Sequence, residues 1–166
     1  MYGAAKLCAS LYGAVLAAER GIPFLNLRLF GVFGIGEASH RVVPYLISKL
    51  RENQPVDLTP GEQVRDWLYV DDIVDALLEA ATCPHLPESG VFNICSGHAT
   101  RVREISEQVA DAMNKPKDLL RFGARPYRPD ESMWIVGDNR RFTEATAWLP
   151  RVSLAEGIRR MAAQPA

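Results

Sequence analysis

A tyrosine and a lysine stand four residues apart at the start of the chain, Tyr2 and Lys6 in the run YGAAK. On a helix this spacing places a phenol and an ammonium on one face, within reach of one small molecule. A tyrosine that works as a base near pH 7 needs about 4 kcal/mol of stabilisation for its phenolate. A cation about 4 Å away supplies an interaction of that size at an effective dielectric of about 20. The pair suits acid–base chemistry, although the same spacing occurs on many helices whose lysine is merely solvated.

The elements around this pair follow from the apolar pattern. An alanine-rich segment from Tyr2 to about Arg20 predicts the helix that carries the pair, and Gly21 is a typical helix end. The next segment, Ile22 to Phe30, predicts a strand. Because apolar residues interrupt its alternation, we expect an interior parallel strand that is buried on both faces.

A glycine-rich loop, Gly31 to Gly36, precedes a helix predicted from about Arg41 to Asn53, with Ser39 as its candidate cap. Strand, glycine loop and helix superficially resemble a dinucleotide-binding unit, and Asp57 follows about twenty residues on. The glycine order is GxxGxG rather than GxGxxG, and the helix does not begin at the last glycine. We therefore assign no dinucleotide binding to this loop.

The second half of the chain predicts further helices and short strands. Asp71 and Asp72 open a helix to about Ala81, where capping and a negative first turn explain them better than metal binding. The region from Lys115 to Asp130 is irregular and basic. The remaining predictions are strands at Gly90 to Ile94 and Trp134 to Val136, a helix from Thr100 to about Asn114, and a closing helix capped by Ser153 and Glu156.

Composition sets the class of protein. With 166 residues, 48% hydrophobic and 23% charged, the chain has the makeup of one globular domain. A net charge of -1 gives no attraction toward nucleic acid or membrane. Cys8, Cys83 and Cys95 show no CxxC pattern, so neither a disulfide framework nor a metal site is predicted. A reducing, cytoplasmic setting is the expectation.

Six segments, in order and at suitable spacings, together resemble the NAD-dependent epimerase/dehydratase family of extended short-chain dehydrogenases. They are YGAAK from Tyr2, LRLFGVFG from Leu27, RDWLYVDD from Arg65, NICSG from Asn93, RPDE from Arg128 and WLPRVSL from Trp148. The resemblance implies an α/β fold, made of the C-terminal part of a Rossmann-like parallel sheet and a small substrate-binding lobe. The family's N-terminal nucleotide-binding half is missing, so residues 1–166 are expected to be the C-terminal half, with no internal domain boundary.

The resemblance also implies roles for the residues around the cofactor. It implies an enzyme that acts on a nucleotide-diphosphate sugar with NAD or NADP, by hydride transfer at carbon 4. Tyr2 takes the role of acid or base, and Lys6 holds the nicotinamide ribose and assists the tyrosine. Phe30 and Val32 belong to the segment that faces the nicotinamide. Gly31 falls at the substrate, where family members often carry Asn, so that side-chain hydrogen bond is not expected here.

Three arginines match substrate positions of the family. Arg41 lies where the next helix starts, and Arg65 and Arg128 match the arginines that bind the diphosphate, a task suited to a planar guanidinium. The alternatives are structural. Arg65 also suits an ion pair with Asp66 or Glu62, and Arg128 also suits a solvated loop charge.

Several functions stay open within this resemblance. An epimerase, a dehydratase and a 4-ketoreductase are all compatible with it, and the run from Arg128 to Met133 favours the 4-ketoreductase. The competing class is a non-catalytic module, truncated or a pseudoenzyme, that binds a nucleotide or a partner through Arg65 and Arg128. Without the glycine-rich turn, the chain alone is expected to bind no nicotinamide cofactor and to be inactive. A homodimer of the full-length enzyme is compatible with the resemblance, and nucleic acid and membrane are not expected partners.

Overall fold

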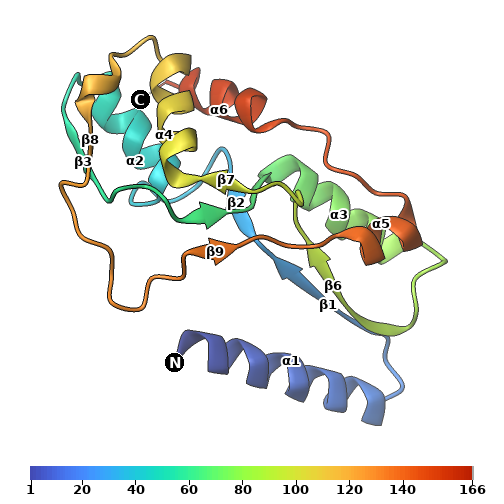
Figure 1. Cartoon of the computed structure of the whole chain (residues 1–166). Helices are drawn as coiled ribbons and strands as arrows, with labels where there is room; N and C mark the ends of the chain where they lie inside the picture. Colours follow the sequence, from blue (N-terminus) through green and yellow to red (C-terminus); the bar gives the residue numbers. More distant parts are fainter. Residues whose placement is uncertain (166) are drawn as a thin grey trace.

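The computed structural model describes residues 1–165, which fold as an α/β protein (Figure 1). The sequence predicted a single unit of residues 1–166, of which Ala166 lies outside the described residues. The helices are α1 (Tyr2–Glu19), α2 (Val42–Arg51), α3 (Val70–Thr82), α4 (Val102–Ala112), η1 (Lys117–Leu119), α5 (Arg140–Thr146) and α6 (Leu154–Ala162). The strands are β1 (Phe24–Leu29), β2 (Gly31–Phe33), β3 (Val56–Leu58), β4 (Val64–Arg65), β5 (Trp67–Tyr69), β6 (Ser89–Ile94), β7 (Thr100–Arg101), β8 (Leu120–Phe122) and β9 (Trp134–Ile135).

The central strands are parallel, and the chain changes its partner strand between β1 and β2. β1 pairs with β6, and β2 pairs with β5. Between them, the backbone N–H of Phe30 donates to the carbonyl of Ile94 (3.2 Å), and that of Gly31 donates to the carbonyl of Asp66 (3.0 Å). The extended chain therefore passes from one partner to the next without an unpaired backbone N–H at the junction.

Two smaller sheets adjoin the central strands. β3 pairs in parallel with β8, whereas β4 lies between antiparallel β7 and parallel β9. β4 runs through Asp66 directly into β5, so the β7-β4-β9 sheet is covalently continuous with the central strands. In Figure 1 the β3 and β8 strands lie with α2 and α4 at one end of the molecule, and α1 lies at the other.

Two hydrophobic cores hold the sheets to the helices. The first joins α2, α4 and α6 to β2 and β5, and Leu46 and Ile105 are fully buried in it. Gly157 of α6 lies directly against the rings of Phe33 and Tyr69, where a side chain would collide with both. The two rings meet edge to face, with centroids 5.5 Å apart.

The second core lies beneath α3 and α5. The ring of Phe142 stands between those of Phe92 and Trp148, at centroid distances of 5.7 and 5.6 Å. Leu25 and Leu27 pack against this cluster from one face of β1. The apolar residues Leu25 and Leu27, which helped to predict the strand, therefore lie on the face of β1 that packs against the second core.

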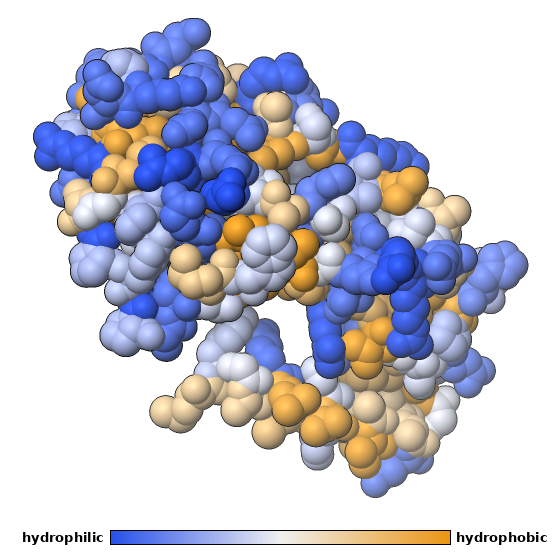
Figure 2. Space-filling model, viewed as in Figure 1, coloured by the Kyte–Doolittle hydropathy of each residue, from blue (hydrophilic) through white to orange (hydrophobic). Residues whose placement is uncertain are grey.

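α1 is largely exposed along its length. Its one buried residue is Ala17, and Leu7, Leu11 and Val15 are each more than half exposed. Gly13 lies against the ring of Phe24 at the start of β1. Figure 2 shows the resulting apolar surface along this helix and beside it. No described helix is both long enough and apolar enough to span a membrane.

The expectation that β1 is an interior strand buried on both faces is wrong for the described residues. β1 pairs with β6 alone among residues 1–165, and Arg28 and Leu29 near its end are exposed. The physical reason is that α1 touches the outer face only near the start of the strand, so the rest of that face has no cover.

Local patterns misplaced three other features. The predicted glycine loop begins as strand β2, because β5 supplies its hydrogen-bonding partners. Ser39 does not cap α2, whose N-cap is Arg41 without a side-chain capping bond. Asp71 and Asp72 occupy the first turn of α3 as predicted, but neither is its N-cap. Strand β8 and helix α5 were not anticipated at all.

The closing helix is confirmed. α6 begins after Ser153, whose hydroxyl accepts a hydrogen bond from the backbone N–H of Glu156 (3.2 Å). The segment before it is tied down by Asp72, whose carboxylate accepts from the backbone N–H groups of Arg151 (2.9 Å) and Val152 (3.1 Å). Asp72 therefore holds the link between α5 and α6 rather than the end of its own helix.

A second buried aspartate, Asp66, joins three segments at the centre of the molecule. Its Oδ1 accepts from the backbone N–H (2.7 Å) and the hydroxyl (2.8 Å) of Ser96. Its Oδ2 accepts from the backbone N–H groups of Gly97 (2.9 Å) and Gly137 (3.2 Å). The residue is 1% exposed, so these four donors replace the water that a free carboxylate would hold.

Replacing Asp66 by Asn should destabilise the fold by about 3 kcal/mol, because the amide keeps one acceptor oxygen and turns two N–H donors toward backbone donors. Urea denaturation followed by circular dichroism measures the loss as a lower midpoint. The matched control is Asp75→Asn on the exposed face of α3, where we expect an unchanged midpoint. Equal midpoints for the two variants would contradict the role assigned to Asp66.

Candidate active site

Tyr2 and Lys6 lie one turn apart on α1. The ammonium of Lys6 is 5.6 Å from the centroid of the Tyr2 ring, so the structure brings the two groups together as predicted. Tyr2 is 79% exposed, and neither side chain has a hydrogen-bond or ion-pair partner within residues 1–165. In Figure 1 the N-terminal half of α1 stands apart from the other elements, and Figure 2 shows an open notch beside it.

The segment predicted to face the nicotinamide, Phe30 to Phe33, follows β1 at its carboxyl end. Gly31 has no room for a side chain, because an added Cβ would collide with the backbone carbonyl oxygen of Asp66. Phe33 is buried in the first core, and both Val32 and Phe33 line a cavity. The missing side chain at Gly31 is thus matched by the close approach of β5.

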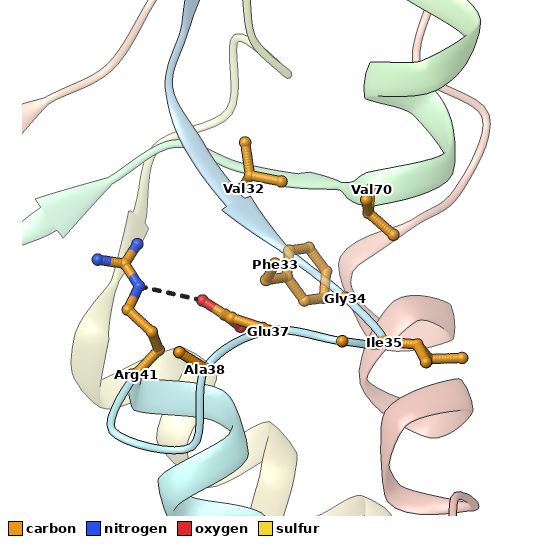
Figure 3. Close-up of a pocket in the computed structure, with 9 residues that line it drawn as sticks. Val32, Phe33, Gly34, Ile35, Glu37, Ala38, Arg41 and Val70 are labelled. Atoms are coloured by element: carbon orange, nitrogen blue, oxygen red, sulfur yellow. Dashed lines mark hydrogen bonds and ion pairs between the residues drawn. The ribbon is translucent and has the colours of Figure 1, made fainter.

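This cavity, of about 340 Å³, opens at the carboxyl ends of the parallel strands β2 and β5 (Figure 3). Ligands of open α/β sheets characteristically bind at this edge. The cavity is walled mainly by apolar groups and by the glycines of the loop after β2. Its apolar lining residues are Val32, Phe33, Ile35, Ala38 and Val70.

Glu37 and Arg41 are the two charged residues of the cavity lining. The Nε of Arg41 donates to Oε1 of Glu37 at 3.2 Å, and Figure 3 shows the two side chains pointing toward one another. Burial raises the pKa of the Glu37 carboxyl, and the neighbouring Arg41 opposes this in part. Sequence reasoning placed Arg41 at the substrate but missed Glu37, whose only signal was its position four residues before an arginine.

Arg65 is tied to the loop that carries Arg128, through Glu131. The guanidinium of half-buried Arg65 is ion-paired with the Glu131 carboxylate and also donates to the carbonyl of Val64 (2.8 Å). The backbone N–H of Glu131 donates to the carbonyl of Arg128 (3.1 Å), whose own side chain is exposed. The ion pair therefore anchors this loop at β4, whereas no described contact joins the two arginine side chains.

The alternative partners predicted for Arg65 were wrong. The carboxylate of Asp66 accepts hydrogen bonds from backbone donors instead. Glu62 is exposed and pairs with Arg101 and Arg103, each at 3.4 Å. The pairing with Glu131 joins residues 66 positions apart, which no local pattern predicts.

The described residues near the site supply neither a reactive thiol nor a cluster of metal ligands. Cys95 is fully buried, and burial together with the nearby Asp66 charge raises the pKa of its thiol to about 12. A thiol held neutral in this way is no nucleophile at pH 7. Within residues 1–165, no three histidine, cysteine or acidic side chains gather as metal ligands.

Comparison with known proteins matches this arrangement to one family. Residues 1–95 match the model of the NAD dependent epimerase/dehydratase family. The CDP-abequose synthase of Salmonella typhimurium is 30% identical over 149 residues, which cover 88% of this chain and 50% of that protein. Other relatives are named as a 4-dehydrogenase, a reductase and 4-epimerases of nucleotide sugars.

Solved structures agree. A UDP-glucose 4-epimerase with UDP-glucose from Thermotoga maritima is 28% identical with a TM-score of 0.88, over 97% of this chain and 52% of that one. A UDP-glucose 4-epimerase of Thermus thermophilus in complex with NAD is 26% identical with a TM-score of 0.85, over 97% and 52%. The chain belongs to the NAD-dependent epimerase/dehydratase family, and it spans about half the length of the curated relatives it matches.

Replacing Gly31 by Ala should destabilise the fold by about 1 to 3 kcal/mol, since the new methyl group meets a backbone oxygen that only a shift of β2 or β5 can relieve. Thermal unfolding measures the change. Gly3→Ala serves as the control, because an added Cβ meets nothing there and alanine favours the helix. An unchanged stability for Gly31→Ala would show that the two strands separate freely.

Proposed function

We propose that this chain supplies the Tyr–Lys helix and the substrate-binding lobe of an NAD(P)-dependent nucleotide-sugar epimerase, dehydratase or 4-ketoreductase. The observation that carries the proposal is the stacked pair on α1, with the Lys6 ammonium 5.6 Å from the Tyr2 ring and both groups open to solvent. Family membership supports the same assignment. Among the three reactions, the sequence from Arg128 to Met133 favours the 4-ketoreductase.

The chemistry follows from the two side chains. The phenol of Tyr2 exchanges a proton with the hydroxyl at carbon 4 of the sugar, and the Lys6 ammonium stabilises the phenolate that results. A bound nicotinamide supplies the hydride exchange at the same carbon. Lys6 has free donors for the cofactor ribose, since the structure gives its ammonium no hydrogen-bond or ion-pair partner within residues 1–165. Phe30 and Val32 are proposed to face the nicotinamide ring.

We further propose that residues 1–166 act as the C-terminal half of the enzyme, completed by a nucleotide-binding half. Two features of the fold support this. β1 has an unpaired edge within the described residues, and α1 exposes an apolar stripe that a stable structure usually covers. A parallel strand added beside β1 would pair its free edge and cover part of the apolar stripe of α1.

The diphosphate of the substrate is assigned to Arg65 and Arg128. A diphosphate carries two negative charges, against the single charge of the Glu131 carboxylate that now holds Arg65, and it has enough oxygens to take both guanidinium groups at once. Arg41, at the cavity, is assigned to the sugar side of the same ligand.

Arg65→Ala or Arg128→Ala should weaken the binding of UDP to the purified chain by about 1.5 to 3 kcal/mol, the scale of a lost charged hydrogen bond. Isothermal calorimetry measures this, and uridine, which lacks the diphosphate, should lose much less. The control is Arg121→Ala, an exposed arginine paired with Asp57 at 3.7 Å, which should leave both affinities unchanged. Equal losses for UDP and uridine would mean that the two arginines are structural.

The catalytic assignment is tested with the nucleotide-binding half of a relative joined ahead of Tyr2. In that enzyme Tyr2→Phe should lower turnover by about 10² to 10⁴, the usual contribution of a positioned acid or base, without loss of folding. Lys6→Met should weaken cofactor binding and move the activity profile to higher pH, because the phenolate loses its cation.

Tyr12→Phe is the matched control, since Tyr12 is exposed on the same helix ten residues further on. It should leave turnover and the pH profile unchanged. A pH profile that does not move in Lys6→Met would show that Lys6 does not act on Tyr2. Full activity of Tyr2→Phe would instead show that Tyr2 is not the acid or base, and no activity of the unsubstituted joined enzyme would favour the non-catalytic module.

A further inference from the structure

The Glu37 carboxylate in the cavity after β2 has one oxygen without a partner. Oε1 is held by Arg41, but Oε2 is buried and accepts no hydrogen bond in the described structure. The Glu37 side chain is 12% exposed, against 55% for Arg41. A buried carboxylate oxygen without a donor is unfavourable and rare in folded proteins, so a missing donor is the simplest explanation.

The surroundings limit what that donor can be. The remaining cavity wall is apolar or glycine, so it offers no side-chain donor of its own, and the backbone N–H of Gly34 offsets only part of the effect of burial on the carboxylate. The raised pKa of the carboxyl agrees with an anion that lacks full solvation. A ligand that fills this cavity must therefore bring a hydroxyl or amine hydrogen for Glu37 and an apolar surface for the wall.

A hexose ring has this combination, because its hydroxyl groups donate at the rim while its C–H face is apolar. A sugar acid lacks it at the position of its carboxylate, which would meet Glu37 as a like charge in a partly desolvated site. Arg41 compensates little for such a ligand, since its Nε is already bound to Glu37 and its side chain is largely in solvent.

We propose that Glu37 determines substrate specificity, by accepting a hydrogen bond from a hydroxyl of a neutral nucleotide-linked hexose and by rejecting a hexuronate at the same place. This rests on the proposed function, because it takes the sugar of a nucleotide sugar to be the group that enters the cavity. Glu37 acts here as an acceptor that contacts the substrate and not as the acid or base of the reaction.

Calorimetry on the purified chain with UDP, UDP-glucose and UDP-glucuronate tests the inference. UDP-glucose should bind about tenfold or more tighter than UDP-glucuronate, the ratio expected for one hydrogen bond to a charged group. In Glu37→Gln, which keeps the size of the side chain and removes its charge, that ratio should fall to about twofold or less, while the affinity for UDP stays unchanged.

Two further variants sharpen the result. Glu37→Asp keeps the charge but withdraws the carboxylate, so it should still bind UDP-glucuronate weakly and lose part of the gain for UDP-glucose. Glu52→Gln, at the exposed end of α2, should change none of the three affinities. If Glu37→Gln does not fold, the wild-type ratio and Glu37→Asp decide the question.

The outcomes separate the two proposals. Binding of UDP that depends on Arg65, with equal affinities for the two sugar nucleotides, overturns the role of Glu37 and leaves the proposed function standing. A preference for UDP-glucose that persists in Glu37→Gln also overturns it. A chain that binds none of the three ligands overturns both proposals.

Discussion

The buried carboxylate of Asp66 is the interaction on which the arrangement of the site depends. It accepts hydrogen bonds from the segments that follow β6 and β9, and so holds them against the residue that joins β4 to β5. Its own backbone carbonyl receives Gly31, so the junction of β1 and β2 is tied to the same point. Arg65 precedes it, and β5 follows it and leads to Val70 of the cavity lining, so Asp66 helps to position both Arg65 and the cavity.

The proposed site is divided among parts of very different rigidity. Arg65 belongs to a strand, and the cavity lies in the loop that directly follows one; these strands are fixed by the two cores and by Asp66. Tyr2 and Lys6 belong to a helix with a single buried residue. Helices in proteins owe most of their stability to packing. The residues proposed to bind the substrate are therefore held in place by more packing than the proposed proton-transfer pair.

The sequence predicted what local pattern determines and missed what distant pairing determines. The Tyr2–Lys6 face, strand β6 and the Ser153 cap follow from spacing within a few residues, and each is found in the structure. The pairing of Arg65 with Glu131 and the four donors of Asp66 join segments far apart in the chain, so no spacing rule reaches them. β1 looked interior because most of its residues are apolar, whereas among the described residues it pairs along one edge, with β6.

The attachment of α1 gives its first turn a long lever arm. The helix touches the sheet around Gly13 and Ala17, and Tyr2 lies about 16 Å beyond Gly13 along the axis at about 1.5 Å per residue. A tilt of about 5° at the attached end would therefore carry the phenol through about 1.4 Å, whereas misplacement by about 1 Å can cost a catalytic group about 10²-fold in rate. In the proposed enzyme, the surface that supports the free end of this helix would set the position of the Tyr2 phenol, and mutations on that surface would lower turnover without touching either substrate or cofactor.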